Sequence, residues 1–496
     1  MKKNSENIPM LSKTRYQAGL QCPLRLWHTC YNREMATEVS RVQQAIFHTG
    51  HRVGALATQL YPGGIRIEED HLHHQEAVKS TLVAMEDPNV KAIYEAGFLY
   101  NEVRVRVDIL QRLKNGKWNL IEVKSSTRVK EEYYADVGIQ YFVLKGAGLH
   151  IDGVFLMHLN NQYVYDGKTL DLEGLFSSSD LTEGAIAYQE EIPKMLAGLK
   201  EMLAAADPPG IAPSKHCNRP YGCEFWEYCM RGMPDHWVIQ LSGIGQKKLD
   251  ELEEMGIYDI GEIPDGFGLS AIQERIRNCV VNKEVYVSRE LREELEDMEF
   301  PIHFLDFETF ALAIPRYAGT RPYQGIPFQW SDHILHKNGK IEHQEYLCEE
   351  DKDPREEFTL TLLDVLGSKG SIVTYTDYEK RIIEALARDH PEHHKPLLAT
   401  LDRLVDLHKI IRNNYYHPEF HGSFSLKSVL PAIIPEMSYD SLTVQEGQEA
   451  GIEYMRMIDP STPANEKEEI KKDLLKYCGH DTLAMVRIRE ALLKLF

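Results

Sequence analysis

Two carboxylates interrupt an apolar, strand-like stretch past the middle of this 496-residue chain, in HFLDFETF at residues 303–310. Asp306 and Glu308 are two residues apart, and on a strand two such side chains project from the same face. That face must meet a cation rather than apolar side chains, because burying two unpaired carboxylates is costly. The spacing predicts a cation site on a strand, although a strand end with a solvent-facing pair has the same spacing.

Further candidate ligands lie nearer the C-terminus. In KYCGHDTLAMVRI, Tyr477 and Asp481 are four residues apart and share one side of an amphipathic helix. The segment TYTDYEKRII supplies another acid, either Glu379 or Asp377. With the strand pair these make four carboxylates, enough to hold two cations on either side of a scissile phosphate. Tyr477 would orient the attacking water.

The order Asp-x-Glu, aromatic-acid, Tyr-x3-Asp resembles the DnaQ-like DEDD exonucleases of the tyrosine subtype. The resemblance implies a ribonuclease H-like α/β layer and a 3'-5' exonuclease that uses Mg²⁺ or Mn²⁺. The site residues that it implies are Asp306, Glu308, Glu379, Tyr477 and Asp481. The third acid departs from the family pattern, which usually has Asp after the aromatic residue where Glu379 follows Tyr378.

A second carboxylate set lies in the front half. FLYNEVRVRVDILQRL and WNLIEVKSS are strand-like and flank the turn KNGK, so a hairpin would bring Asp108 close to Glu122 and Lys124. Two carboxylates can hold a hard divalent cation, and a lysine can stabilise charge that develops on a phosphate. EVK alone is equally typical of a solvent-exposed strand face, so the interpretation depends on the neighbouring motifs.

Those neighbours, RVDIL upstream and a helix with a Gln-Tyr pair downstream, resemble the RecB-like branch of the PD-(D/E)XK nucleases. The metal and catalytic residues implied by this resemblance are Asp108, Glu122, Lys124, Gln140 and Tyr141. Members often add a metal-binding His on the first helix, a few residues after a Gly. Gly54 stands at that place here, with His48 and His51 nearby, so the identity of a fourth ligand stays open.

Four cysteines are placed as metal ligands would be. Cys22 precedes the front core, and Cys217, Cys223 and Cys229 follow it within thirteen residues. Zinc with His216, or simple core thiols, would also account for the three. One thiol before the core and three after it resemble the iron-sulfur clasp of AddB and of CRISPR-associated RecB-like exonucleases, which implies a 4Fe-4S cluster. Cys30 is a weaker candidate for the single thiol. The other cysteines are predicted to be core residues or to have no specific role: Cys279, Cys348 and Cys478.

These motifs predict two α/β domains, one with a restriction-endonuclease-like core and cysteine clasp at 1–235 and one with a ribonuclease H-like core at 300–496. The helical connector at 236–299 contains SGIGQKKL, which resembles a helix-hairpin-helix, but Gly243 and Gly245 would serve equally well in a plain spacer. Near the back site, aromatic residues beside basic ones in DLHKIIRNNYYHPEFHGSFSLKSVLPAI could stack on bases and hold a single strand. GSFSLKSVLP would be a wall of this kind with Lys427 on phosphate, although a capped helix accounts for its serines equally well. Together the halves resemble a bacterial family with a RecB-like front fused to a DnaQ-like back.

Bulk properties limit the alternatives. A net charge of −20 argues against a protein that coats nucleic acid by general attraction, although a local basic channel is compatible with it. No apolar run has the roughly 20 residues of a membrane-spanning helix, and MKKNSENIPMLSK contains no apolar core of a leader, so the cytoplasm is expected. The sequence thus predicts a metal-dependent nuclease that acts on single strands or ends in DNA processing, repair or defence, with DNA favoured over RNA by the resemblances. A helicase or repair partner is compatible with this role, but no residue indicates one. A nucleic-acid-binding scaffold with decayed sites and an RNA exonuclease are the alternatives.

Overall fold

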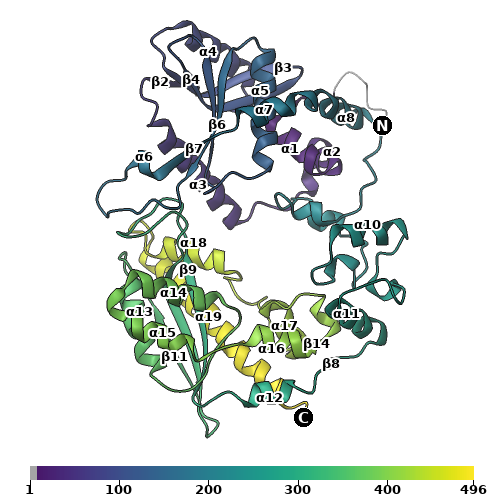
Figure 1. Ribbon diagram of the computed structural model, residues 1–496, viewed down its shortest axis with the longest axis vertical. Coiled ribbons are helices and arrows are strands. Elements are labelled where there is room, and N and C mark those ends of the chain that lie inside the picture. The colour runs from purple at the N-terminus through teal and green to yellow at the C-terminus, as the bar shows by residue number, and fades with distance from the viewer. Residues whose placement is uncertain (1–7) are drawn as a thin grey trace. The chain divides into compact units, whose positions relative to one another are not determined.

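The computed structural model describes residues 8–496, which divide into two compact units (Figure 1). Unit 1 comprises the described residues up to Gly232 together with Ala313–Tyr323, and unit 2 comprises Met233–Leu312 and Gln324–Phe496. Both units combine a β-sheet with packed helices, which confirms the predicted α/β class with two domains. Residues 1–7, most of the stretch inspected for a leader, lie outside the described residues.

Unit 1 is built on a mixed sheet with the strand order β2-β3-β4-β5-β6-β7, and the short β1 pairs in parallel with β4. The hairpin predicted around KNGK joins β4 to β5, and Gly116 adopts a φ of +79° in its turn. The strands are β1 (Leu11–Ser12), β2 (Gly64–Arg66), β3 (Ala92–Tyr100), β4 (Val103–Arg112), β5 (Trp118–Lys124), β6 (Ile151–Leu159) and β7 (Phe176–Asp180).

Alternate residues of the unit 1 strands face two cores. Leu110 and Leu120 pack with helices α4, α5 and α8, whereas Ile109 and Ile121 pack with Val53 and Ala57 of α3. This alternation follows from the two-residue period of a strand. The helices are α1 (Lys13–Gln21), α2 (Pro23–Tyr31), α3 (Arg41–Thr58), α4 (His74–Glu86), α5 (Glu132–Gly146), α6 (Leu172–Leu175), α7 (Thr182–Ala187), α8 (Ile192–Ala204) and α9 (Trp226–Cys229).

The segment Ala313–Tyr323 joins β9 to β10 of unit 2 in the sequence, yet it packs with unit 1. Gly319 N–H donates to Tyr165 O at 2.8 Å, and Tyr165 N–H donates to Thr320 O at 3.0 Å. Ala313 adds to the core that contains α3. The chain therefore passes between the units at three places, and the front unit is not confined to the front half of the sequence.

Unit 2 contains a five-stranded sheet in the order β11-β10-β9-β12-β13. Strand β10 is antiparallel to both of its neighbours, β9 and β11, whereas β12 is parallel to both β9 and β13. Helices α13 to α15 cover one face around a core with Leu305 and Phe307, and α18 and α19 pack against the other. A two-stranded sheet, β8 with β14, lies apart from it. The strands are β8 (Tyr286–Val287), β9 (Ile302–Phe310), β10 (Ile326–Leu335), β11 (Ile341–Leu347), β12 (Ile372–Thr374), β13 (Leu404–Asp406) and β14 (Tyr415–Tyr416).

The predicted connector at 236–299 is helical and packs with unit 2. Ser288 Oγ donates to Asn414 Oδ1 at 2.6 Å, and Arg275 Nη1 donates to the carbonyls of Arg412 and Asn413 at 2.9 Å each. The turn before α10 has Gly243 at a φ of +69°, as a tight glycine corner requires. Unit 2 helices are α10 (Gln246–Glu254), α11 (Ala271–Asn282), α12 (Leu291–Glu296), α13 (Arg355–Leu366), α14 (Tyr378–Asp389), α15 (His394–Leu401), α16 (Leu407–Asn414), α17 (Leu426–Ile433), α18 (Gly447–Met457) and α19 (Ala464–Leu493).

Among residues 8–496, no helix combines the length and the apolar character needed to cross a bilayer.

Candidate carboxylate sites and the cysteine group

Asp306 and Glu308 lie on the face of β9 that α18 and α19 cover. Between and beside them, Leu305 and Phe307 point into the opposite core. The partner positions on β10 are Ser331 for Asp306 and Gln329 for Glu308, which places both acids on one face as their spacing predicts. Glu308 is only 4% exposed, so its carboxyl group is shielded from solvent.

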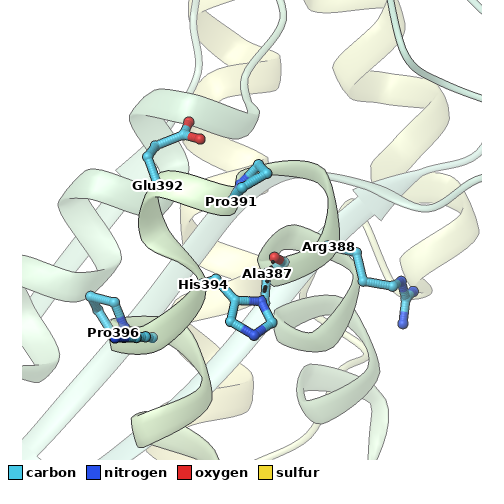
Figure 2. Close-up of a pocket in the computed structure, with 7 residues that line it drawn as sticks. Ala387, Arg388, Pro391, Glu392, His394 and Pro396 are labelled. Carbon is cyan, nitrogen blue, oxygen red and sulfur yellow. Dashed lines mark hydrogen bonds between the residues drawn. The ribbon is translucent and has the colours of Figure 1, made fainter.

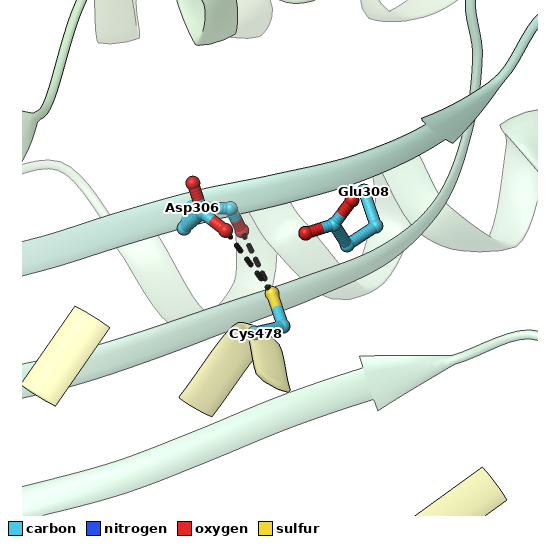
Figure 3. Close-up of side chains that lie close together, drawn as sticks. All are labelled: Asp306, Glu308 and Cys478. Atoms are coloured by element: carbon cyan, nitrogen blue, oxygen red, sulfur yellow. Dashed lines mark hydrogen bonds between the residues drawn. The ribbon is translucent and has the colours of Figure 1, made fainter. Parts of the chain in front are cut away.

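Helix α19 brings Tyr477, Cys478 and Asp481 to the same face. The Cys478 thiol donates to Asp306 Oδ2 at 3.4 Å and lies 3.7 Å from the Asp306 carbonyl oxygen (Figure 3). One ligand atom from each of Asp306, Glu308 and Cys478 lies within 4.8 Å of the other two. Tyr477 and Asp481 are both buried. Strand β9 and the C-terminal helix α19, which are far apart in the sequence, thus meet at one place.

Without a metal, Cys478 is a hydrogen-bond donor to Asp306. Burial and the charge of Asp306 raise the pKa of its thiol well above the usual range, which favours the protonated donor form in this arrangement. We therefore assign Cys478 to holding the Asp306 carboxylate, a contact that the prediction of a plain core cysteine did not include.

Glu379 is placed beside the pair, and Asp377 is not. Glu379 sits in the first turn of α14, is 3% exposed, and its Oε2 has no hydrogen-bond partner among the described residues. Its charge contributes to raising the pKa values of Asp306 and Glu308. The Asp377 side chain is 69% exposed and pairs with Arg381 at 3.4 Å. Of the two candidates for the third acid, the structure favours Glu379.

We call Asp306, Glu308, Glu379 and Asp481 the acid group. Burial, followed by the repulsion of neighbouring acids, raises the pKa values of Asp306 and Glu308 well above their usual range. Burial also raises the pKa of Glu379 to about 8 and that of Asp481 to about 6. Several buried carboxylates with an unpartnered oxygen form a donor set that fits a hard divalent cation, which would repay their desolvation.

Two further residues lie beside the acid group, and the sequence predicted only one of them, Lys427. Tyr439 donates a short hydrogen bond to Asp481 Oδ1, and nothing in PEMSYDSL indicated it. Lys427, which the sequence suggested as a phosphate-binding residue, is exposed, and its ammonium lies 5.8 Å from the Tyr439 ring centre. Its positive charge opposes, without cancelling, the rise in the pKa values of Glu308 and Asp481. The site therefore has two tyrosines and one lysine among its acids.

The aromatic residues of the segment around Lys427 do not form an exposed stacking surface. Tyr415, Tyr416, Phe420 and Phe424 are all buried and contact one another edge to edge or at a tilt. They are core residues of unit 2, so the prediction that they stack on bases is wrong. Lys427 is the part of that segment which stays available to a ligand.

Replacing Glu379 with Gln should raise the metal-free stability of the chain at pH 8. The pKa of Glu379 increases from 4.5 to about 8 on folding, so the folded state loses stability as the pH rises between these values. The neutral amide avoids that loss, on the order of a few kcal/mol. Thermal unfolding in EDTA at pH 5 and pH 8 measures the effect. Asp377→Asn is the control, because it removes an exposed acid of the same helix whose charge makes only a small contribution to the Glu379 pKa, so it should change the difference between the two melting temperatures far less. An equal response of both variants would contradict the placement of Glu379.

Unit 1 brings together four of the five residues predicted for the front site: Asp108, Glu122, Lys124 and Gln140. Ile109 on β4 pairs with Ile121 on β5, and Asp108 comes directly before the first and Glu122 directly after the second. Asp108 Oδ2 accepts a hydrogen bond from Val123 N–H at 2.7 Å. Lys124 Nζ contacts Glu122 Oε1 at 2.6 Å, and Gln140 Nε2 on α5 donates to Glu122 Oε2 at 2.8 Å. Burial and the charge of Glu122 raise the pKa of Asp108 to about 7. The hairpin and α5 thus assemble a buried carboxylate pair with a lysine.

Other predicted unit 1 residues lie elsewhere. Tyr141 is partly buried against the hydrophobic core, with Lys145 Nζ 5.9 Å from its ring centre. His48 and His51 are exposed on α3. Gly54, on the same helix, has no atom within 4 Å of the place where a Cβ would stand. The helix itself packs on β5 through its apolar side. Among the described residues of unit 1, the carboxylates of the site have their hydrogen bonds and ion pairs with other residues.

The sequence missed two members of this site, Lys13 and Asp136. Lys13 Nζ lies 2.7 Å from Glu122 Oε1 and 3.1 Å from Asp136 Oδ1. Burial raises the pKa of Asp136, but the charges of Lys124 and Lys13 outweigh burial and hold it below the usual range. The helical Asp-x3-Gln spacing of Asp136 and Gln140 places both on one side of α5 and could have indicated Asp136. We call Lys13, Asp108, Glu122, Lys124 and Asp136 the lysine–carboxylate group.

The four predicted cysteines come together in unit 1. Cys22 lies between α1 and α2, and its charge adds to burial in raising the pKa values of Cys217 and Cys229. Burial raises the pKa of Cys223 to about 11, with a smaller contribution from Cys217. Gln21 Nε2 fastens the loop by donating to the carbonyls of His216 at 2.8 Å and Tyr221 at 2.7 Å. We call Cys22, Cys217, Cys223 and Cys229 the cysteine group.

The chemistry of the cysteine group limits what it could hold. Thiolates are ligands of both tetrahedral zinc and iron-sulfur clusters. Four thiols from both ends of one domain are a donor set that fits an iron-sulfur cluster, which is commonly held by four cysteine thiolates.

A surface pocket of about 760 Å³ lies at the far end of α14 (Figure 2). There His394 Nδ1 contacts the Ala387 carbonyl at 2.9 Å. Ala387 is eight residues beyond Glu379, or about 12 Å along the helix, so the pocket is separate from the acid group. Its lining residues are Ala387, Arg388, Pro391, Glu392, His394, Lys395 and Pro396.

Comparison with known families gives one match. Residues 303–425, about a quarter of the chain, match the family model described as a domain of unknown function, DUF2779. The matched region begins on β9 beside Asp306 and Glu308 and ends just before Lys427. No curated protein matches the chain.

Proposed function

We propose that the chain is a metal-dependent nuclease that hydrolyses phosphodiester bonds of DNA, with one site in each unit. The observation that carries the proposal is the acid group, in which side chains from β9, α14 and α19 converge although they are up to 175 residues apart (481 − 306). Buried carboxylates that repel one another are costly in a structural role. Bound divalent cations would offset the cost of burying these carboxylates, which supports a metal site rather than a structural role.

In unit 2, Asp306, Glu308, Glu379 and Asp481 would hold one or two Mg²⁺ or Mn²⁺ ions, which activate water and neutralise charge on the phosphate when bound. Tyr439 holds the Asp481 carboxylate through its hydrogen bond. Tyr477, next to it on α19, can orient a water molecule for attack. The exposed Lys427 ammonium can bind a phosphate of the strand.

In unit 1, Asp108 and Glu122 would hold a divalent cation, and Lys124 provides a positive charge for a phosphate oxygen. Gln140 fixes Glu122 by donating to its second oxygen. The cysteine group would hold a 4Fe-4S cluster that ties the segment before the sheet to the segment after it. These assignments follow the RecB-like resemblance and agree with how the side chains are grouped.

The proposal of DNA over RNA rests on the resemblance to RecB-like and DnaQ-like enzymes. The acid group itself is indifferent to a 2'-hydroxyl, because cations contact the phosphate rather than the sugar. End-labelled single-stranded DNA, duplex DNA and RNA should be incubated with the full chain and Mg²⁺ or Mn²⁺, with EDTA as the control. We expect cleavage of DNA that EDTA abolishes. Cleavage of RNA alone would replace the substrate assignment, and cleavage of neither would leave a nucleic-acid-binding protein.

A further inference from the structure

The ammonium of Lys13 lies between two buried carboxylates of unit 1. Its Nζ is 2.7 Å from Glu122 Oε1 and 3.1 Å from Asp136 Oδ1. Lys124 Nζ contacts the same Glu122 oxygen at 2.6 Å and the other Asp136 oxygen at 2.5 Å, while Gln140 donates to Glu122 Oε2. Both oxygens of each carboxylate therefore already accept hydrogen bonds from the protein. In this state the protein supplies its own counter-ions to the site.

The position of Lys13 is specified by the fold. Strand β1 pairs with β4 at Val103 and Arg104, which fixes the backbone immediately before Lys13. The Ser12 hydroxyl then caps α1 by accepting from Arg15 N–H at 3.2 Å. Lys13 is the first residue of that helix, where a cation opposes the helix dipole, and the first turn contains no acid to offset it. Helix stability does not account for a lysine here, whereas the two carboxylates do.

The lysines lie on the solvent side of the carboxylates. The side chains of Lys13 and Lys124 are 20% and 23% exposed, while those of Glu122 and Asp136 are 2% and 1% exposed. An anion that approaches from solvent therefore meets the two lysine side chains before it meets Glu122 or Asp136. Each ammonium has three N–H donors, so it can contact a phosphate oxygen while it keeps one carboxylate partner.

We propose that Lys13 is a phosphate-binding residue of the unit 1 site and that it serves as a counter-ion of Glu122 until a divalent cation replaces it. The inference rests on the nuclease function proposed above. Three carboxylates face two ammonium groups in the lysine–carboxylate group, so a cation shared by Asp108 and Glu122 makes the Lys13 contact with Glu122 redundant. Asp136 still holds Lys13 at the edge of the site, where the freed N–H can donate to a phosphate.

The test compares Lys13→Met, Lys13→Arg and Lys130→Met in a chain whose unit 2 site is disabled by Asp306→Asn. Lys130 is the matched control, because it lies near the start of α5 but pairs with Glu132 at 3.9 Å rather than with the carboxylates of the site. Thermal unfolding of each protein gives the melting temperature without metal, the melting temperature at saturating Mn²⁺, and the Mn²⁺ concentration at half-maximal stabilisation. Steady-state kinetics give kcat and KM for single-stranded DNA.

For Lys13→Met we expect a melting temperature that is lowered without metal, a Mn²⁺ midpoint that falls by about tenfold, and a melting deficit that disappears at saturating Mn²⁺. The KM for DNA should rise more than kcat falls, and Lys13→Arg should restore DNA binding. A deficit that persists at saturating Mn²⁺ would assign Lys13 a purely structural role and overturn the inference. An unchanged Mn²⁺ midpoint would overturn it too. If the Asp306→Asn parent itself neither responds to Mn²⁺ nor cuts DNA, the proposed function of unit 1 fails instead.

Discussion

Asp306→Asn should abolish DNA cleavage by unit 2, lowering its rate by at least about a hundredfold. The amide keeps the shape of the side chain but removes a charged ligand from the acid group. It also removes the negative charge that raises the pKa of Cys478, so the Cys478 thiol loses its charged partner while its packing stays the same. Steady-state cleavage of end-labelled single-stranded DNA with Mg²⁺ measures the loss.

Stability separates a lost site from a lost fold. Burial and neighbouring acids raise the pKa of Asp306, so the neutral side chain should leave the metal-free melting temperature at pH 8 unchanged or higher. The stabilisation by added Mg²⁺ should shrink at the same time. A variant that melts much earlier than the parent chain would mean that the activity was lost through unfolding, and the acid group would then lack support as a metal site.

Asp108→Asn provides the reciprocal measurement for unit 1. If both units cleave, each single variant should retain the products of the other unit, and only the double variant should be inactive. Full activity in the double variant would remove the enzymatic interpretation of both carboxylate sites. Loss in only one single variant would identify which unit is the nuclease.

The sequence was sufficient to predict which side chains share a face when that depends only on the repeat of a strand or a helix. Asp306 and Glu308 share a face because strand side chains alternate, and Tyr477 and Asp481 share a side because helical residues four apart are neighbours. Both relations hold whatever the rest of the fold does. The choice between Glu379 and Asp377 was not local, since it depends on where α14 begins relative to the sheet.

Contacts that depend on the packing of distant segments were missed. Tyr439 reaches Asp481 from a loop without a recognisable motif, and Lys13 reaches Glu122 over 109 residues through the pairing of β1 with β4. In the other direction, the aromatic residues near Lys427 suggested a stacking surface, but apolar rings serve equally well in a core. Composition alone could not distinguish these uses, because burial is set by the tertiary structure.

Cys223→Ala should lower the melting temperature of unit 1 on the order of 10 °C or more, if the cysteine group holds a metal centre. Cys22 and Cys223 are 201 residues apart (223 − 22), so a centre bound by both closes a long loop around the sheet of unit 1. Losing one ligand releases that closure. Cys30→Ala is the matched control, because Cys30 is also a partly buried cysteine next to the clasp, on α2, and should cost far less.

Metal content decides what the cysteine group holds. We expect brown protein with iron and acid-labile sulfide in amounts near that of one four-iron cluster, and both should be lost in Cys223→Ala but kept in Cys30→Ala. Colourless protein with one zinc would replace the cluster while preserving the closure argument, since zinc would also tie the two segments together. Equal melting temperatures for Cys223→Ala and the parent chain would contradict the closure itself, because the cysteines would then be ordinary core residues whose thiols happen to lie near one another.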